Sequence, residues 1–179
     1  GLGDNPEVVK VDEDTAYTIG LGFGSYIKSI GKTTCVLGHD DRLSGDVLYN
    51  ALATGILETG IDIISLGLCT TPMYYYGWDL LDVHAGVMVT ASHNPKDDNG
   101  FKFSYNGIHN AYGTSSMDLY DLIINNKFID SSVMGSLKTV DIKREYVKMI
   151  TSSIKLGNRK LKVIYDCGNG TTSIVADDI

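Results

Sequence analysis

Cysteine is scarce in this 179-residue sequence, and its placement disfavours two common kinds of structural site. Cys35, Cys69 and Cys167 are odd in number and far apart, and they lack the paired spacing of zinc ligands. Unpaired thiols of this kind are typical of a reducing compartment. We therefore expect reduced, mostly buried thiols of a cytosolic protein, with neither a disulfide framework nor a zinc site.

Long apolar runs and basic runs are also absent. No stretch approaches the roughly 20 apolar residues that a membrane helix needs, and the N-terminus lacks the basic-then-apolar pattern of a signal segment. The formal charge is −7, and no basic or basic-aromatic patch interrupts it. We therefore expect a cytoplasmic protein that binds neither a membrane nor nucleic acid.

The remaining composition, 43% hydrophobic and 21% charged, is that of an ordinary globular protein with room for one domain and part of another. Apolar spacing predicts alternating helices and strands. The predicted helices cover residues 12–30, 44–60, 72–81, 116–126 and 140–154, and the predicted strands cover residues 33–38, 61–66, 85–90, 101–104 and 161–166. Strand, helix and strand at this spacing form a βαβ unit.

Side chains that cap helix N-termini mark three of the helix starts. Asp12 or Asp14 caps the first helix, and Ser44 caps the second. For the third, Thr71 is the predicted N-cap, with Pro72 at the first helical position, where its missing N–H is not needed.

Three other features have structural interpretations. The aromatic run at residues 73–78 could form a stacking platform, but its helical spacing favours packing. His84 and His109 are isolated, so we expect structural or surface roles for them. Asp97 and Asp98 are interpreted as a solvated pair rather than metal ligands.

The densest cluster of reactive side chains follows the predicted strand at residues 85–90. Ser92 lies just beyond the strand end, where open α/β sheets place their ligands, and is a candidate nucleophile. We expect its neighbour His93 to point away from it, as adjacent side chains do on an extended backbone. The glycine-flanked nucleophile turn of α/β-hydrolases is absent as well, which disfavours a serine hydrolase.

A phosphorylated Ser92 gives every part of this loop a role. The exposed N–H groups, Asn94, His93 and Lys102 would balance the phosphoryl charge, with Lys102 assigned to the phosphoryl oxygens. A phosphoserine would also offer an oxygen ligand to Mg²⁺. Asp40 and Arg42 are expected to brace the site through a turn and an ion pair rather than touch substrate.

The sequence Thr-Ala-Ser-His-Asn-Pro at residues 90–95, followed by Asn-Gly-Phe-Lys at 99–102, resembles the active-site signature of the α-D-phosphohexomutases, the phosphoglucomutase/phosphomannomutase family. Residues 38–44, 67–72 and 166–170 resemble further family segments in the family's order. The resemblance implies an α/β fold in which a mixed β-sheet is sandwiched between helices, forming domain I over residues 1–139. Residues 140–179 would be a linker helix and the incomplete start of a second, similar α/β domain.

The resemblance implies reversible intramolecular phosphoryl transfer between the 1- and 6-positions of hexose phosphates, through a phosphoserine and a hexose 1,6-bisphosphate. Mg²⁺ and the bisphosphate activator would be its cofactors, and a hexose phosphate its substrate. The alternative is a non-catalytic phosphosugar-binding or assembly module. Exposed edges of the unfinished second unit could promote dimerisation.

The resemblance also assigns roles to single residues. Ser92, His93 and Lys102 would be catalytic, and Ser92 would bind the metal through its phosphate. Asn94, Asp40 and Arg42 would position the phosphate or substrate. His39 stands where many members have an arginine. The family's metal loop, sugar-reading loop and phosphate-binding domain are not in the chain, so we expect the isolated chain to be inactive.

Overall fold

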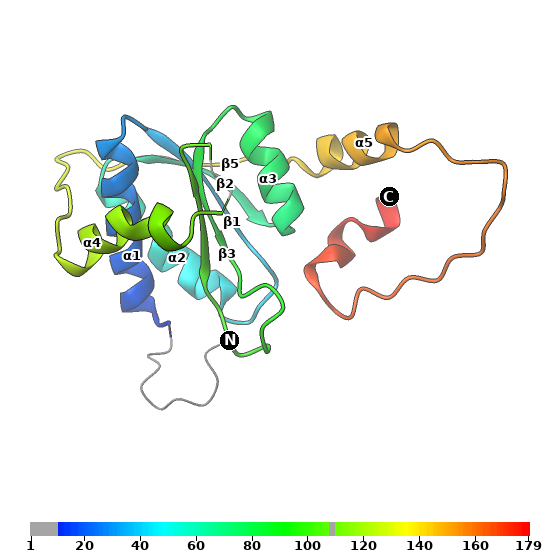
Figure 1. The fold of residues 1–179 in the computed structure, drawn as a ribbon, viewed down its shortest axis with the longest axis horizontal. Coiled ribbons are helices and arrows are strands. Elements are labelled where there is room, and N and C mark those ends of the chain that lie inside the picture. The colour runs from blue at the N-terminus through cyan, green and yellow to red at the C-terminus, as the bar shows by residue number, and fades with distance from the viewer. Residues whose placement is uncertain (1–10, 108–109) are drawn as a thin grey trace.

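A mixed five-stranded β-sheet organises the computed structural model, which describes residues 11–107 and 110–179 (Figure 1). The strands are β1 (Thr34–His39), β2 (Asp62–Leu68), β3 (Ala85–Val89), β4 (Phe101–Tyr105) and β5 (Leu137–Thr139). Their order in the sheet is β4-β3-β1-β2-β5. All neighbours pair in parallel except β4, which runs antiparallel to β3.

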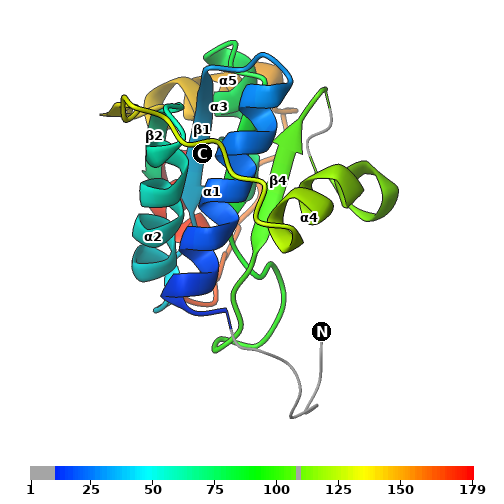
Figure 2. The same ribbon diagram turned by 90° about the vertical axis from the view of Figure 1, so that its left-hand side faces the viewer.

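Helices cover both faces of the sheet, so the predicted sandwich is confirmed (Figure 2). One apolar cluster joins a sheet face to α1 (Glu13–Ser29), α2 (Gly45–Glu58) and α4 (Met117–Ile124). The other cluster joins the opposite face to α3 (Thr71–Leu80) and α5 (Lys143–Ser153). Because both faces are covered, the central strands are nearly continuous apolar runs, and every residue of β3 is buried.

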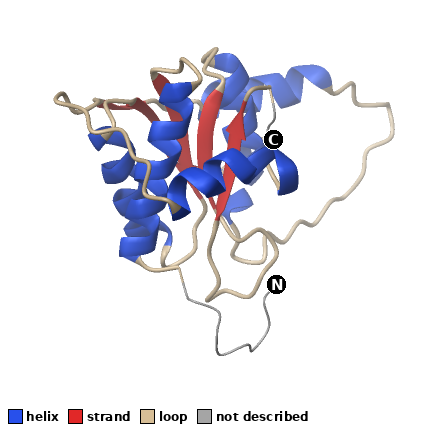
Figure 3. Ribbon diagram, turned by 60° about the vertical axis from the view of Figure 1, so that its left-hand side comes forward, coloured by secondary structure: helices blue, strands red, loops and turns tan. Residues whose placement is uncertain are grey.

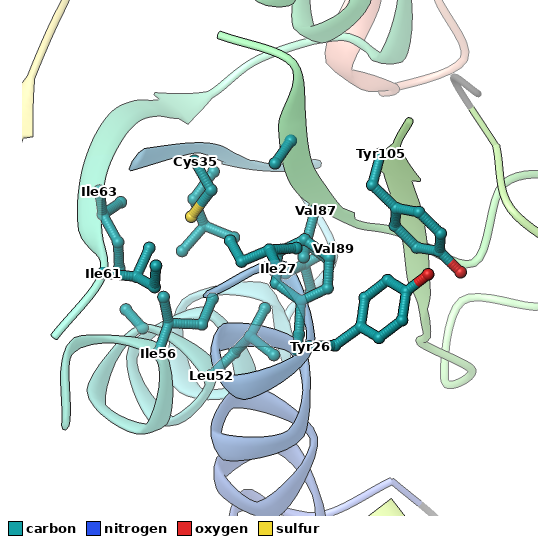
Figure 4. Packing of buried hydrophobic residues seen from close by; sticks show 14 of the residues in the cluster. Tyr26, Ile27, Cys35, Leu52, Ile56, Ile61, Ile63, Val87, Val89 and Tyr105 are labelled. Atoms are coloured by element: carbon teal, nitrogen blue, oxygen red, sulfur yellow. The ribbon is translucent and has the colours of Figure 1, made fainter. Parts of the chain in front are cut away.

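The larger cluster fills the space between the sheet and the α1–α2 pair (Figure 4). Ile27 of α1 and Leu52 of α2 lie against Cys35, Ile63 and Val87 of three neighbouring strands, and all five are at most 1% exposed. Burying aliphatic side chains of this size contributes about 1.5–3 kcal/mol each. This cluster therefore holds the α1–α2 pair against the sheet.

Two glycines allow α1 and α2 to approach closely. A Cβ atom on Gly20 would lie 2.3 Å from the carbonyl oxygen of Leu52, and one on Gly55 would lie 2.3 Å from the carbonyl oxygen of Tyr17. Both obstacles are backbone atoms, which cannot rotate away. The helix pair therefore requires glycine at each of these positions.

The helix starts follow the capping prediction in part. Asp12 accepts a hydrogen bond from the Thr15 N–H, as predicted. The cap of α3 is Thr70 and not Thr71, because the Thr70 hydroxyl accepts the Met73 N–H at 3.2 Å. Ser44 precedes α2 without capping it, since its hydroxyl instead accepts a hydrogen bond from Asn99.

The prediction was wrong for the C-terminal segments. Residues 161–166 are extended and exposed but form no strand, because no described strand lies beside them to pair with (Figure 3). After residue 170 the chain forms two short 3-10 turns, Thr171–Ile174 and Ala176–Asp178. Strand β5 was not predicted, since its three residues are exposed at the sheet edge and carry no apolar pattern.

The structure also places the aromatic run, two of the cysteines and His84. Tyr74 and Trp78 are buried in the α3 cluster, which confirms packing for the aromatic run. Cys35 and Cys69 are buried free thiols. His84 is exposed and contacts Asp82, whereas His109 lies outside the described residues. None of the helices that the structure describes is long and apolar enough to cross a membrane.

Substitution of Gly55 by Ala should destabilise the protein, because the added methyl group meets the α1 backbone. Overpacking costs about 1–3 kcal/mol, offset in part by a gain in helix propensity of about 1 kcal/mol. We expect the free energy of unfolding in urea to fall by up to about 2 kcal/mol. Gly157→Ala is the control, since no heavy atom lies within 4 Å of its added Cβ. Equal stabilities of the two variants would contradict the close-contact account.

Candidate functional site

The polar residues singled out in the sequence gather where the parallel strands end. The loop at residues 90–100, here called the Ser92 loop, leaves β3 and returns to β4, and the turn at residues 40–42 follows β1 (Figure 1). The Asp40 N–H donates to the Val89 carbonyl at 3.1 Å, which joins the turn to the end of β3. At the base of the loop, the Thr90 N–H donates to the Gly100 carbonyl at 2.9 Å.

Arg42 holds the Ser92 loop through four main-chain carbonyl groups. Its Nη1 donates to the carbonyls of Pro95 and Asp98 at 2.5 and 2.8 Å, and its Nη2 donates to those of Ser92 and Asn94 at 3.1 and 2.8 Å. A guanidinium group suits this arrangement because its donors lie in one rigid plane. Arg42 therefore fixes the backbone of the loop rather than pointing into open solvent.

Asp40 fixes Arg42 in turn. One oxygen of its carboxylate lies 3.4 Å from the Arg42 Nε, and the other accepts the Arg42 main-chain N–H at 3.2 Å. The two side chains are only 13% and 11% exposed, so little water screens the ion pair. The polar donors around both groups offset the cost of burying the charges.

Thr90 completes this framework, although the sequence analysis assigned it no role. Its hydroxyl donates to the Asp40 carboxylate at 2.5 Å and accepts the Ser92 N–H at 2.9 Å. The Ser92 residue is thereby held at both ends, its N–H by Thr90 and its carbonyl by Arg42. A threonine hydroxyl often accepts the main-chain N–H of the residue two positions later. The spacing of Thr90 and Ser92 was therefore the sequence signal that could have predicted this contact.

The expectation that Ser92 and His93 point apart was wrong. Ser92 has a φ of 57°, in the left-handed region, and not the extended backbone on which the expectation rested. The Ser92 hydroxyl therefore lies 3.0 Å from Nδ1 of His93. Positive φ costs a non-glycine residue of order 1–3 kcal/mol, and the contacts from Thr90 and Arg42 stabilise it here.

Lys102 and Asn94 are less directly connected to Ser92. Lys102 lies on β4 in register with Met88, and its ammonium group forms no hydrogen bond or ion pair with the residues that the structure describes. Asn94 contacts Arg42 through its carbonyl, and its exposed side chain is directed to solvent. Direct contacts thus join Ser92 to His93 and, through Arg42, to Asp40, whereas Lys102 lies on the neighbouring strand β4.

A second connection ties the loop to α2. Nδ2 of Asn99 donates to the Ser44 hydroxyl at 3.0 Å, and Oδ1 of Asn99 accepts the Gly100 N–H at 2.8 Å. His39, at the end of β1, lies edge-on to Tyr49 of α2 and 2.9 Å from the Asp40 carbonyl through Nδ1. His39 therefore packs against α2.

The site has few carboxylates for a metal ion. Within residues 11–107 and 110–179, no group of three or more histidine, cysteine or acidic side chains is arranged to hold one. Asp97 is exposed and Asp98 half-buried, in a loop whose carbonyls face Arg42. The arrangement offers an exposed hydroxyl on a rigid backbone, next to an imidazole, which suits a serine that carries a covalent group.

Comparison with protein families identifies the same region. The model described as phosphoglucomutase/phosphomannomutase, alpha/beta/alpha domain I, matches residues 3–129. These residues include four strands of the sheet, α1 to α4 and the whole Ser92 loop.

Known proteins of that kind resemble nearly the whole chain. It is 35% identical to a phosphomannomutase of Vibrio cholerae, covering 95% of this chain and 38% of the relative. It is 36% identical to a phosphomannomutase/phosphoglucomutase of Pseudomonas putida, covering 93% of this chain and 35% of the relative. A crystal structure of a phosphoglucomutase/phosphomannomutase family protein from Burkholderia thailandensis matches with a TM-score of 0.84 and 35% identity, over 98% of this chain and 38% of that one. The chain therefore spans little more than a third of the length of these relatives.

Replacing Arg42 by Lys should loosen the Ser92 loop, because a single ammonium group cannot bind four carbonyls and Asp40 together. Hydrogen bonds to charged groups contribute about 1.5–3 kcal/mol each. We expect amide hydrogen exchange of residues 90–100 to accelerate by about tenfold or more, measured by mass spectrometry.

Arg144→Lys is the matched control, since Arg144 is exposed on α5. Exchange in β1 and β3 should change in neither variant. Unaltered exchange of residues 90–100 in Arg42→Lys would show that the loop does not depend on the guanidinium group.

Proposed function

The chain belongs to the phosphoglucomutase/phosphomannomutase family, and from this membership we propose that it is the part of a phosphohexomutase that carries the phosphoryl group, on Ser92. The observation that supports this most strongly is that the main chain of Ser92 is fixed by hydrogen bonds on both sides. Its hydroxyl is exposed, while both ends of its backbone are held, the N–H by Thr90 and the carbonyl by Arg42. A group that must give and accept a phosphoryl unit needs access and a fixed position together.

The proposed reaction consists of two phosphoryl transfers, and the group that leaves Ser92 differs from the group that later replaces it. The Oγ–P bond of phosphorylated Ser92 breaks as a hydroxyl of a hexose phosphate forms the new O–P bond, giving a hexose 1,6-bisphosphate. After the sugar turns over, its other phosphoryl group returns to Ser92, and the phosphate has moved between the 1- and 6-positions. The substrates would be glucose or mannose phosphates, in line with the names of the relatives.

His93 and Lys102 have distinct proposed roles. Nδ1 of His93, 3.0 Å from the Ser92 hydroxyl, can take the proton when the serine accepts a phosphoryl group and return it in the reverse step. The ammonium group of Lys102, which forms no ion pair with any described residue, would supply positive charge to the phosphoryl oxygens. Asp40, Arg42 and the Asn94 backbone would position the loop.

This chain can supply only part of the coordination shell of a Mg²⁺ ion. A phosphoryl oxygen on Ser92 is a hard donor suited to Mg²⁺, whereas the described residues offer no acidic cluster to complete its coordination. When bound, the ion would neutralise charge that develops on the transferred phosphoryl group. We propose that its other ligands lie outside this chain.

The proposal has a second consequence for the 179 residues taken alone. They cover 38% of the Vibrio relative, and the residues that the structure describes hold no acidic cluster arranged to bind a metal ion. We propose that they do not isomerise hexose phosphates by themselves.

Two rival functions make different predictions. A non-catalytic phosphosugar-binding module would bind hexose phosphates but leave Ser92 unmodified. A serine hydrolase draws support from the short distance between Ser92 and His93, but no carboxylate of a described residue contacts the other ring nitrogen of His93. Covalent labelling of Ser92 by an acyl-type probe would favour that hydrolase.

The central test maps phosphate on the full-length natural protein that contains this sequence. After incubation with glucose or mannose 1,6-bisphosphate, we expect intact mass to rise by one phosphoryl group and peptide mapping to place it on Ser92. Ser92→Ala should abolish the modification and the mutase activity. Ser152→Ala, which changes an exposed α5 serine bonded within its own helix, is the control and should change neither.

Phosphate on another residue, or none on an active full-length protein, would refute the assignment. Mutase turnover by residues 1–179 alone would instead refute the proposal that the chain is incomplete as a catalyst.

A further inference from the structure

The chain after α5 returns to the body at the turn that holds the Ser92 loop. It leaves α5, passes through an extended, exposed stretch and comes back as the 3-10 turns at residues 171–178, here called the docked segment (Figure 1). The Thr171 hydroxyl donates to the Asp41 carboxylate at 2.7 Å and accepts the Asp41 N–H at 3.1 Å. These two bonds join residues 130 positions apart.

Two further contacts hold the docked segment in place. Val175 is 3% exposed and packs, together with Ile174, in the apolar cluster under α3. At the far end, the Asp178 carboxylate lies 2.8 Å from Nζ of Lys143 on α5. The segment is therefore attached by its own contacts and not only through the extended stretch that precedes it.

Asp41 lies between the two residues that organise the Ser92 loop. Asp40, before it, binds the Thr90 hydroxyl, and Arg42, after it, binds four carbonyls of the loop. Asp40 and Arg42 thus contact the Ser92 loop, while Asp41 between them contacts the docked segment. Because the backbone of a short turn moves as a unit, releasing its middle residue shifts the neighbours on which the loop depends.

We infer that Thr171 is a positioning residue for the Ser92 loop, and that it acts through Asp41 to couple the docked segment to the turn at residues 40–42. The coupling itself is a property of the described contacts, whereas its importance for phosphoryl transfer rests on the proposed function. Such coupling is reciprocal: loosening the segment loosens the loop, and loosening the loop loosens the segment.

The cysteines provide a direct measure of segment docking. Cys35 and Cys69 are both 0% exposed, and burial raises the pKa of the Cys69 thiol to about 12. Cys167, four residues before Thr171, is only half-buried. Reaction of the folded chain with a disulfide reagent such as dithionitrobenzoate therefore reports on Cys167.

The test compares Thr171→Val, which removes the hydroxyl and preserves the shape, with Thr171→Ser, which keeps the hydroxyl. Thr172→Val is the control, because Thr172 is exposed and its side chain contacts no described residue through a hydrogen bond. In Thr171→Val we expect two changes of about two- to tenfold, the effect of losing a hydrogen bond. Labelling of Cys167 and amide exchange of residues 90–100 should both become faster.

Thr171→Ser and Thr172→Val should both resemble the parent chain in Cys167 labelling and in amide exchange of residues 90–100. Combining Thr171→Val with Asp41→Ala should give no more acceleration than Thr171→Val alone, since the Thr171 hydroxyl makes both bonds to Asp41. If Thr171→Val fails to fold, judged by circular dichroism, Asp41→Asn replaces it: the turn N–H stays, the acceptor is weakened, and the same two changes are expected.

Faster Cys167 labelling with unchanged exchange of residues 90–100 would overturn the inference, as would no change in either measurement. Neither measurement involves phosphoryl transfer. A failure to find phosphate on Ser92 would therefore refute the proposed function without affecting the inferred coupling. Unchanged amide exchange of residues 90–100 would refute the coupling without affecting the proposed function.

Discussion

The arrangement of the site depends on the ion pair between Asp40 and Arg42. The carboxylate orients the guanidinium group, the guanidinium binds four carbonyls of the Ser92 loop, and the second role of the carboxylate is to orient Thr90. Removing either charge would leave the other largely buried without its partner, which typically costs about 3–5 kcal/mol. The pair is therefore a stronger constraint on the loop than any single contact that Ser92 makes.

The fold explains why this pair can form. Parallel strands β1 and β3 are neighbours in the sheet, so the segments that follow them leave from the same edge. Apolar packing of α1 and α2 against one face and α3 against the other fixes the strand ends. What remains at the edge is a turn and a loop whose backbone groups are bonded to each other, and the strained backbone of Ser92 is held between them.

Local sequence signals predicted most of the scaffold and part of the site. Apolar patterns located four of the five described strands and every described α-helix, and the residues around Ser92 carried the family signature. The patterns could not show that Ser92 has a positive φ, because that depends on Thr90 and Arg42, which act from two segments. They missed β5, which is short and exposed, and they predicted a strand at residues 161–166, where apolar residues have no described partner strand. The contact between Asp41 and Thr171 joins distant segments and leaves no local pattern.

The central claim is that this framework positions Ser92 for phosphoryl transfer, and a single-turnover measurement tests it most directly. Full-length protein phosphorylated on Ser92 would be mixed with excess hexose phosphate, and loss of the phosphoserine followed by rapid quench. Thr90→Val removes the donor to Asp40 and the acceptor for the Ser92 N–H, whereas Thr90→Ser keeps both. Since small displacements of reacting groups are costly, we predict transfer at least about tenfold slower in Thr90→Val and near the parent rate in Thr90→Ser. Transfer at the parent rate in both variants would contradict the account.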